Sequence, residues 1–357
     1  MTPWSNRGTG FFMGLLVGLA ATGWVLATNL EAEPVEKVNA GTVIFTRHDA
    51  IYASAVLNDG SLIAVGKFGR ILRSPDKHLA WEEIPSPTTE DLFSVAFRDD
   101  RNGVAVGANG TYLETADGGH TWSSRDMATT SQFLKVVLQP DGSGLIVGSF
   151  GLLWRTDSGG TTWKPVAISW EKVLSQVWDS VGPVEPHLYD AAMLGSVAWV
   201  VGEYGLVLVS TDGTQSFERR RGGQFTDPHL FSVALYDSEH GIAAGQAGLI
   251  VTTEDGGVTW KESSRWETDL YGVSVYNGSA VISGDLGSVL LLPDGSEPAG
   301  FRVVAAAGRS DGTLGDRWIG GVQHIGQGRF LVMGKGPFRT FSLPLQRISK
   351  ADFKPGS

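Results

Sequence analysis

The pattern of apolar and polar positions divides the chain into two unequal parts. Residues 11–30 form a continuous uncharged stretch, and as a helix they would span about 30 Å, the thickness of the hydrocarbon layer of a bilayer. From residue 42 onwards, short apolar runs rich in Val, Ile, Leu and aromatic residues alternate with glycine-rich turns. This second pattern predicts many short β-strands.

The strand-like runs belong to a unit that recurs seven times, and its most regular marker is a pair of glycines separated by two residues. The pairs are Gly66/Gly69, Gly107/Gly110, Gly148/Gly151, Gly202/Gly205, Gly245/Gly248 and Gly284/Gly287, with a contracted seventh at Gly334/Gly336. A four-stranded unit that repeats about every 40–45 residues is typical of a β-propeller blade.

We therefore predict an all-β fold, a seven-bladed β-propeller of four-stranded blades, preceded by one N-terminal transmembrane helix. Propellers close by pairing a strand from one terminus into the blade made by the other, so we expect Thr42–Arg47 to be the outer strand of blade seven. The predicted parts are a cytoplasmic tip and membrane anchor (1–30), a tether (31–41), the propeller (42–350) and a C-terminal tail (351–357).

The anchor interpretation depends on charge and on glycine spacing. Arg7 precedes the uncharged stretch and Glu31 follows it, which favours a cytoplasmic N-terminus and a periplasmic propeller. Gly10, Gly14 and Gly18 lie at four-residue intervals, on a face against which another membrane helix could pack. The alternative is a signal peptide cleaved at Val25-Leu-Ala27, which would leave a soluble periplasmic binding propeller.

A second marker is a turn that reads TADGGHTW at 115–122, TDSGGTTW at 156–163 and TEDGGVTW at 253–260. Asp can cap backbone N–H groups, Gly supplies positive φ, and Trp packs as a large apolar side chain. We predict structural roles for the aspartate and tryptophan residues of these turns, namely Asp117, Trp122, Asp157, Trp163, Asp212, Asp255 and Trp260.

This Asp-box turn, together with the Gly-x-x-Gly turn and a Leu-Phe/Tyr-Ser-Val inner strand, resembles the Ycf48-like propellers, named for photosystem II assembly factors. The resemblance implies a non-enzymatic assembly or accessory factor for membrane proteins. For the proteobacterial branch of the family, which is associated with RND-type exporters, it implies a propeller in the periplasm at the bacterial inner membrane. The partner would then be an inner-membrane protein, an RND-type transporter.

Composition limits the candidate chemistry. The chain has no cysteine, its seven histidines lack the spacing of a metal site, and its net charge of −10 opposes binding to nucleic-acid phosphates. We therefore predict no cofactor, no metal and no nucleic-acid partner. Asp-box propellers also include sialidases and other glycoside hydrolases, so a sialidase-like glycoside hydrolase is the alternative function. Because the repeated aspartates are explained as turn caps, we predict that the protein is not an enzyme.

Two long connections predict where a partner binds. The first contains Ser169–Val181, whose apolar residues include Trp170, Val177 and Trp178 at helical spacing. This apolar stripe would either pack on the propeller or dock in a groove of the partner. The second long connection is Ala305–Arg317, a Gly/Asp-rich loop.

Both connections lead to the face where the inner strands begin. Aligning the repeats places one residue of each at the mouth of the central channel: Ala50, Asp91, Gln132, His187, His229, Asp269 and Arg317. Deeper along the first strands of blades three and four, Lys135 and Asp190 could form an ion pair between blades. The candidate partner-binding residues are Trp170, Val177, Trp178, His187, His229 and Arg317.

Overall fold

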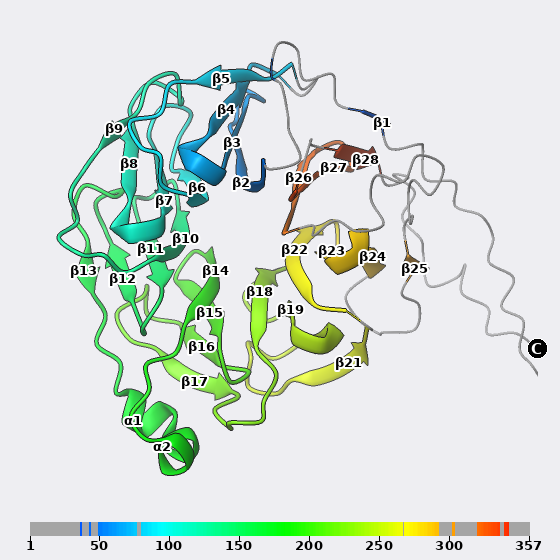
Figure 1. Ribbon diagram of the computed structural model, residues 1–357. Coiled ribbons are helices and arrows are strands. Elements are labelled where there is room, and N and C mark those ends of the chain that lie inside the picture. Colours follow the sequence, from blue (N-terminus) through cyan, green and yellow to red (C-terminus); the bar gives the residue numbers. More distant parts are fainter. Residues whose placement is uncertain are drawn as a thin grey trace, which may run out of the picture. The chain divides into compact units, whose positions relative to one another are not determined.

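The computed structural model describes residues 36–37, 43, 49–76, 80–266, 268–292, 302–303, 320–335 and 339–342. These residues belong to one compact unit, Ala32–Gln346. Its strands form four-stranded antiparallel sheets that stand side by side around a centre (Figure 1). The first strands of successive sheets pack against one another in the order β2, β6, β10, β14, β18, β22 and β26, and β26 returns to β2. This closed ring is the architecture of a β-propeller.

Six sheets are each built from four consecutive strands. The first sheet contains β2 (Ile51–Val56), β3 (Leu62–Gly66), β4 (Ile71–Ser74) and β5 (Glu82–Ile84). The second contains β6 (Leu92–Phe97), β7 (Gly103–Gly107), β8 (Tyr112–Thr115) and β9 (Ser123–Ser124). The third contains β10 (Phe133–Leu138), β11 (Gly144–Gly148), β12 (Leu153–Thr156) and β13 (Lys164–Pro165). The fourth sheet contains β14 (Leu188–Leu194), β15 (Val197–Gly202), β16 (Val207–Ser210) and β17 (Glu218–Arg221). The fifth contains β18 (Leu230–Leu235), β19 (Gly241–Gly245), β20 (Leu249–Thr253) and β21 (Lys261–Arg265). The sixth contains β22 (Leu270–Tyr276), β23 (Ser279–Gly284), β24 (Val289–Leu292) and β25 (Arg302–Val303).

The remaining sheet is composite and corrects the predicted fold class. Six blades, not seven, consist of four consecutive strands, because the last sheet has only β26 (Gly321–Gly326), β27 (Arg329–Met333) and β28 (Arg339–Ser342) from the C-terminal part. Its fourth strand is β1 (Glu36–Lys37), which pairs with β28 in place of the predicted Thr42–Arg47. Val43, the described residue of that segment, lies outside any strand and is buried in the apolar cluster between the composite and first sheets.

The predicted transmembrane helix is not among the described elements. No helix among the described residues is long and apolar enough to cross a membrane. The stretch 11–30, with Gly10, Gly14 and Gly18, lies outside the described residues.

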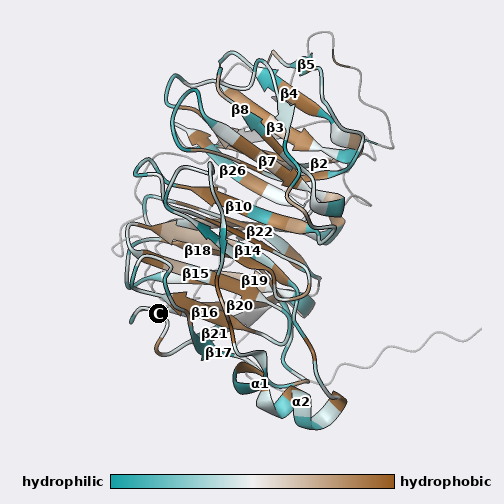
Figure 2. Ribbon diagram, turned by 90° about the vertical axis from the view of Figure 1, so that its left-hand side faces the viewer, coloured by the Kyte–Doolittle hydropathy of each residue, from teal (hydrophilic) through white to brown (hydrophobic). Residues whose placement is uncertain are grey.

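The core lies between neighbouring sheets. Second strands such as β3 and β11 are buried at every position, because sheets cover both of their faces. Hydrophobic residues lie mainly along the strands, and hydrophilic residues lie mainly in the turns that join the strands (Figure 2). The Asp-box tryptophans extend this packing outwards: the ring of Trp122 lies 6.1 Å from that of Phe97, and the ring of Trp260 lies 5.4 Å from that of Trp199.

Each Asp-box turn closes on one side chain. The Asp117 carboxylate accepts hydrogen bonds from the Thr121 N–H at 3.0 Å, the Thr121 hydroxyl at 2.6 Å and the Thr115 hydroxyl at 2.8 Å. Partial burial raises the pKa of Asp117, but these hydrogen bonds outweigh it and hold the pKa at about 2. The Trp122 indole N–H donates to the Gly119 carbonyl at 3.2 Å. The same bonds recur around the equivalent carboxylates, Asp212 and Asp255.

Asp157 does not belong to this set, which corrects its predicted role. In the third sheet Ser158 occupies the box position, and its hydroxyl accepts a hydrogen bond from the Thr162 N–H at 2.9 Å. Asp157 lies one residue earlier and pairs with Lys164 at 3.2 Å on the surface. Trp163 keeps its expected place, and its indole N–H donates to the Tyr112 hydroxyl at 3.1 Å.

We expect Asp117→Ala to lower the free energy of unfolding by about 1–2 kcal/mol, because three hydrogen bonds to a half-exposed carboxylate are lost. Asp157→Ala is the matched control and should leave urea unfolding unchanged. The Asp117 pKa lies below the unfolded value of about 4, so its contribution is present above pH 4 and is lost as the pH falls towards 2. Equal losses for both variants would contradict this assignment.

Candidate partner-binding face

The first strands begin, and the second strands end, at one face of the ring. In the first sheet the N–H of Lys67 donates to the Ala50 carbonyl at 2.9 Å, and in the second the N–H of Ala108 donates to the Asp91 carbonyl at 2.9 Å. Equivalent bonds reach the carbonyls of Gln132, His187, His229 and Asp269. These residues, with the Gly-x-x-Gly turns, are called the mouth face below. Arg317, the predicted seventh member, lies outside the described residues.

The first glycine of each turn is required by this close approach. A Cβ atom on Gly107 would lie 1.9 Å from the Asp91 carbonyl oxygen, and one on Gly66 would lie 2.1 Å from that of Ala50. Because the backbone leaves no room for a side chain, Gly-x-x-Gly is a turn element of the fold.

The third residue of each turn adopts a left-handed conformation although it is not glycine. Asn109 and Ala247, with φ of 52° and 53°, fill this position in the second and fifth sheets. The other four sheets place large side chains there, with φ between 55° and 60°: Phe68, Phe150, Tyr204 and Leu286. We call these four residues the crown. Phe68, Phe150 and Leu286 are 60%, 65% and 63% exposed, so their side chains gain little burial against a conformational cost of about 1–2 kcal/mol each.

Side chains of the mouth face bond the turns of the first, fourth and fifth sheets to the next sheet. The N–H of Phe68 donates to Asp91 Oδ1 at 2.8 Å, and the N–H of Ala247 donates to Asp269 Oδ1 at 2.7 Å. His229 does the same work through Nδ1, which accepts from the N–H of Tyr204 at 3.0 Å. Sequence reasoning placed His229 at the mouth but did not reveal this bond between blades.

His187 and His229 belong to a continuous aromatic cluster. The His187 ring lies 5.2 Å from Phe150 and 6.3 Å from Tyr189, and the Tyr189 ring lies 5.3 Å from Phe231. The cluster continues to Tyr271, whose ring centroid is 5.4 Å from that of Phe231. It therefore spans the turns and first strands of four neighbouring sheets, the third to the sixth.

Carboxylates accompany the tyrosines of this face. The Tyr52 hydroxyl donates to Asp91 Oδ2 at 3.2 Å, and the Tyr271 hydroxyl donates to Asp285 Oδ2 at 3.1 Å. Burial and then the Asp91 charge raise the pKa of Tyr52 to about 12. Burial and the Asp285 charge likewise raise the pKa of Tyr271. The two phenols therefore stay neutral and act as hydrogen-bond donors to Asp91 and Asp285.

Below the mouth lies a channel cavity of about 230 Å³, lined by first-strand residues of several sheets. The predicted ion pair is confirmed here, with Lys135 Nζ 2.8 Å from Asp190 Oδ1. Asp190 Oδ2 also accepts hydrogen bonds from the Ser232 hydroxyl at 2.7 Å and the Val233 N–H at 3.0 Å. One buried carboxylate thus joins the third, fourth and fifth sheets.

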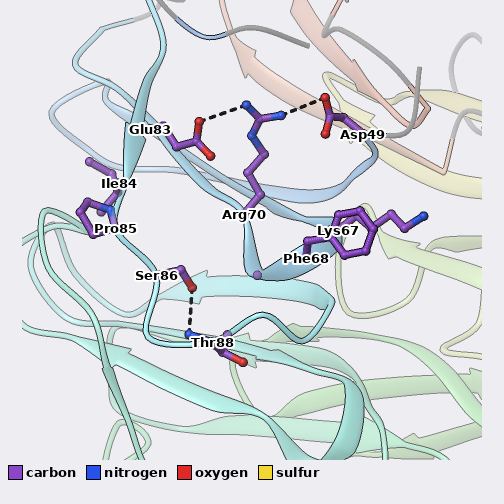
Figure 3. A pocket seen from close by; sticks show the side chains of 10 residues that line it. Asp49, Lys67, Phe68, Arg70, Glu83, Ile84, Pro85, Ser86 and Thr88 are labelled. Atoms are coloured by element: carbon purple, nitrogen blue, oxygen red, sulfur yellow. Dashed lines mark hydrogen bonds and ion pairs between the residues drawn. The ribbon is translucent and has the colours of Figure 1, made fainter. Parts of the chain in front are cut away.

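A second cavity, of about 630 Å³, lies beside the first-sheet turn (Figure 3). Arg70 reaches across it and contacts Asp49 and Glu83, both at 3.1 Å. At the edge of this cavity, Lys67 Nζ lies over the Phe68 ring, 4.7 Å from the ring centre. The guanidinium is matched by two carboxylates, so Arg70 adds no excess positive charge to this cavity.

The predicted helix in the first long connection is broken into α1 (Trp170–Val173) and α2 (Ser175–Val181). Leu174, with φ of −117°, interrupts it, and Ser169 makes no side-chain cap. Trp170 and Val177 are buried in the apolar cluster between the third and fourth sheets, and Trp178 packs against it half-buried. The stripe packs on the propeller, so Trp170 and Val177 are not available to a partner in this arrangement, which corrects that part of the prediction.

Among the described residues, no group of three or more His, Cys, Asp or Glu side chains is placed to hold a metal ion. The second long connection, Ala305–Arg317, lies outside them.

Residues 74–174 match the family model described as photosynthesis system II assembly factor YCF48. This match covers the whole second and third blades and the outer part of the first. None of the curated proteins matches the chain. This part of the propeller is therefore similar to YCF48, and the match does not distinguish the branch associated with RND-type exporters.

Solved structures agree on the fold. A structure described as YCF48 bound to D1 peptide is 14% identical with a TM-score of 0.65, covering 88% of this chain and 98% of that one. YCF48 from Cyanidioschyzon merolae is 15% identical with a TM-score of 0.68, covering 87% and 98%. The GH74 enzyme of Niastella koreensis is 14% identical with a TM-score of 0.59, covering 84% of this chain and 44% of that one. Similarity at this level of identity establishes the fold alone.

Proposed function

We propose that the protein is a non-catalytic assembly or accessory factor that binds a segment of another protein at its mouth face. The observation that carries this proposal is the crown, because large apolar side chains are held exposed and in an unfavourable backbone conformation at one face. A relative of the same fold has been described in complex with a peptide, which supports a peptide as the kind of ligand.

The finer proposal concerns place and partner. We place the propeller on the periplasmic side of a bacterial inner membrane, attached through residues 11–30, with an RND-type transporter as the partner. The support is the uncharged stretch itself and the resemblance of the repeats to the exporter-associated branch.

A glycoside hydrolase is the competing function, favoured by the similarity to the GH74 enzyme. Such an enzyme needs two carboxyl groups flanking the glycosidic bond. Here Asp91 and Asp269 accept backbone hydrogen bonds that join neighbouring blades, and Asp190 is held by Lys135. These structural duties favour the binding role for the mouth carboxylates.

Affinity purification of the full-length tagged chain from solubilised membranes, followed by mass spectrometry, tests the proposal. We expect an integral membrane protein of the RND type to be enriched over an untagged control. Peptides from residues 11–30 should occur in the membrane fraction. Recovery of the chain without an enriched membrane protein would contradict the proposed function, and chains that begin near Thr28 in the soluble fraction would contradict the attachment.

A further inference from the structure

We infer that the mouth face recognises a basic segment of its partner, in which a lysine or arginine side chain is flanked by apolar residues. This inference deepens the proposed function and rests on it for the statement that the ligand is a protein. It follows from three properties of the mouth face: exposed apolar side chains, an excess of carboxylates, and a channel that keeps an unused hydroxyl.

The apolar property belongs to the crown. Asn109 shows that the repeat tolerates a residue suited to the left-handed conformation, yet the equivalent positions carry Phe68, Phe150, Tyr204 and Leu286. Tyr204 is covered in part by the Phe225 ring, 6.3 Å away, and Phe225 is itself 55% exposed. Folding does not explain apolar side chains that are strained and left in solvent, whereas contact with a partner does.

The charge property comes from four half-buried carboxylates of the mouth face, and none of them forms an ion pair with a described residue: Asp91, Glu203, Asp269 and Asp285. The loops 85–91, 126–132, 182–187 and 222–229 lead into first strands and contain acidic residues but no Lys or Arg. Lys67 and Lys335 are the cations within the described turns, and two arginines lie beside them. Arg70 is matched by Asp49 and Glu83, and the Arg221 guanidinium donates to the Gly205 carbonyl at 3.0 Å. With these arginines included, carboxylates still outnumber cations around the aromatic cluster.

The combination selects the ligand. A cationic side chain gains both from carboxylates and from the faces of aromatic rings, such as those of Tyr189, Phe231 and Tyr271. Apolar neighbours of that side chain would cover Phe150 and Leu286. An acidic segment would instead meet like charge at a partly desolvated surface, which is costly.

The channel offers a further polar group. Ser54 lines the cavity and is 8% exposed, and its hydroxyl has no hydrogen-bond partner among the described residues. The hydroxyls of Ser94 and Ser232, which line the same cavity, accept backbone N–H groups of the next sheet at 3.2 Å and 3.1 Å. Ser54 therefore leaves one buried hydroxyl at the wall of the channel without a hydrogen bond to the described residues.

The test measures fluorescence anisotropy of two labelled peptides, GSLKWKLSG and GSLEWELSG, with the full-length protein in detergent. We expect the lysine peptide to bind at least ten-fold more tightly than the glutamate peptide, with affinity that falls as salt is added. Glu203→Gln with Asp285→Asn should reduce binding of the lysine peptide several-fold and weaken its salt dependence.

The crown is tested by Phe68→Asn, Phe150→Asn and Leu286→Asn combined, since asparagine suits the backbone conformation and already occurs at Asn109. We expect an unchanged or raised melting temperature together with at least a ten-fold loss of peptide affinity. Val258→Asn is the matched control, because Val258 is 59% exposed in an Asp-box turn away from the mouth face, and it should bind normally.

Equal or tighter binding of the glutamate peptide, or full binding by the folded crown variant, would overturn the inference. If the crown variant recovers the membrane partner as well as the wild type does, the inference fails and so does the placement of binding at the mouth face, while the accessory role itself stands. If the lysine peptide binds through the crown while no membrane protein is recovered, the site is supported and the proposed function fails.

Discussion

Asp190→Ala is expected to destabilise the propeller by about 2–4 kcal/mol, because it removes a buried carboxylate at the wall of the channel. The substitution removes the partner of Lys135 and the acceptor for the Ser232 hydroxyl and the Val233 N–H. Three sheets lose their shared contact at once. Denaturant unfolding monitored by tryptophan fluorescence measures the loss.

Two further variants locate the source of this stability. Asp190→Asn keeps one acceptor oxygen and should cost less than Asp190→Ala. Lys135→Ala should also cost less, because the carboxylate retains its bonds to the fifth sheet and Lys135 is 35% exposed. If removing Lys135 is as damaging as removing Asp190, the carboxylate is not the centre of the network.

Trp170→Ala is expected to lower the free energy of unfolding by about 3–5 kcal/mol. Trp170 is 9% exposed and lies in the cluster that joins the third and fourth sheets. Its ring packs on Gly151, where an added Cβ would lie 2.4 Å from the indole nitrogen. The loss of the ring leaves a cavity that the short helices α1 and α2 cannot fill.

Val181→Ala is the matched control, because Val181 belongs to the same stripe and is 50% exposed. It should change stability by no more than about 0.5 kcal/mol. A small effect of Trp170→Ala on thermal melting, together with loss of partner recovery, would reinstate the docking role of the stripe.

The repeat could be predicted because every blade needs the same close contact between a turn and the start of its first strand. A glycine that approaches a carbonyl leaves the same mark in every sheet, and the alignment based on it placed Lys135 beside Asp190 correctly. The prediction for Asp157 was wrong, because the aspartate is the second residue of the box Thr-Asp-Ser and the third residue of the boxes that read Thr-x-Asp. The aligned Gly-Gly pair and Trp163 place Ser158 at the box position, and its hydroxyl accepts the bond that the carboxylate accepts elsewhere.

Other features leave no local pattern. β1 is only two residues long and pairs with a strand near the opposite end of the chain, so nothing in its own composition marks it. The apolar run around Val43 suggested a strand, but Val43 fills the core beside Trp81 and Leu331. The crown does leave a signal in the sequence, because a large residue precedes the second glycine in four of the six turns.

The composite sheet sets the order in which the ring can be completed. Six blades can form as their consecutive strands emerge, whereas the last sheet must wait for β28 and must still find β1 unoccupied. The short pairing of Glu36 and Lys37 with Thr340 and Arg339 then forms last and joins the two ends of the chain. The bond from the Ile51 N–H to the Gly334 carbonyl, at 3.0 Å, closes the same seam from the inside. A chain that ends before β26 therefore lacks the whole seam, and the flank of its first sheet is open to solvent and to the strands of other chains.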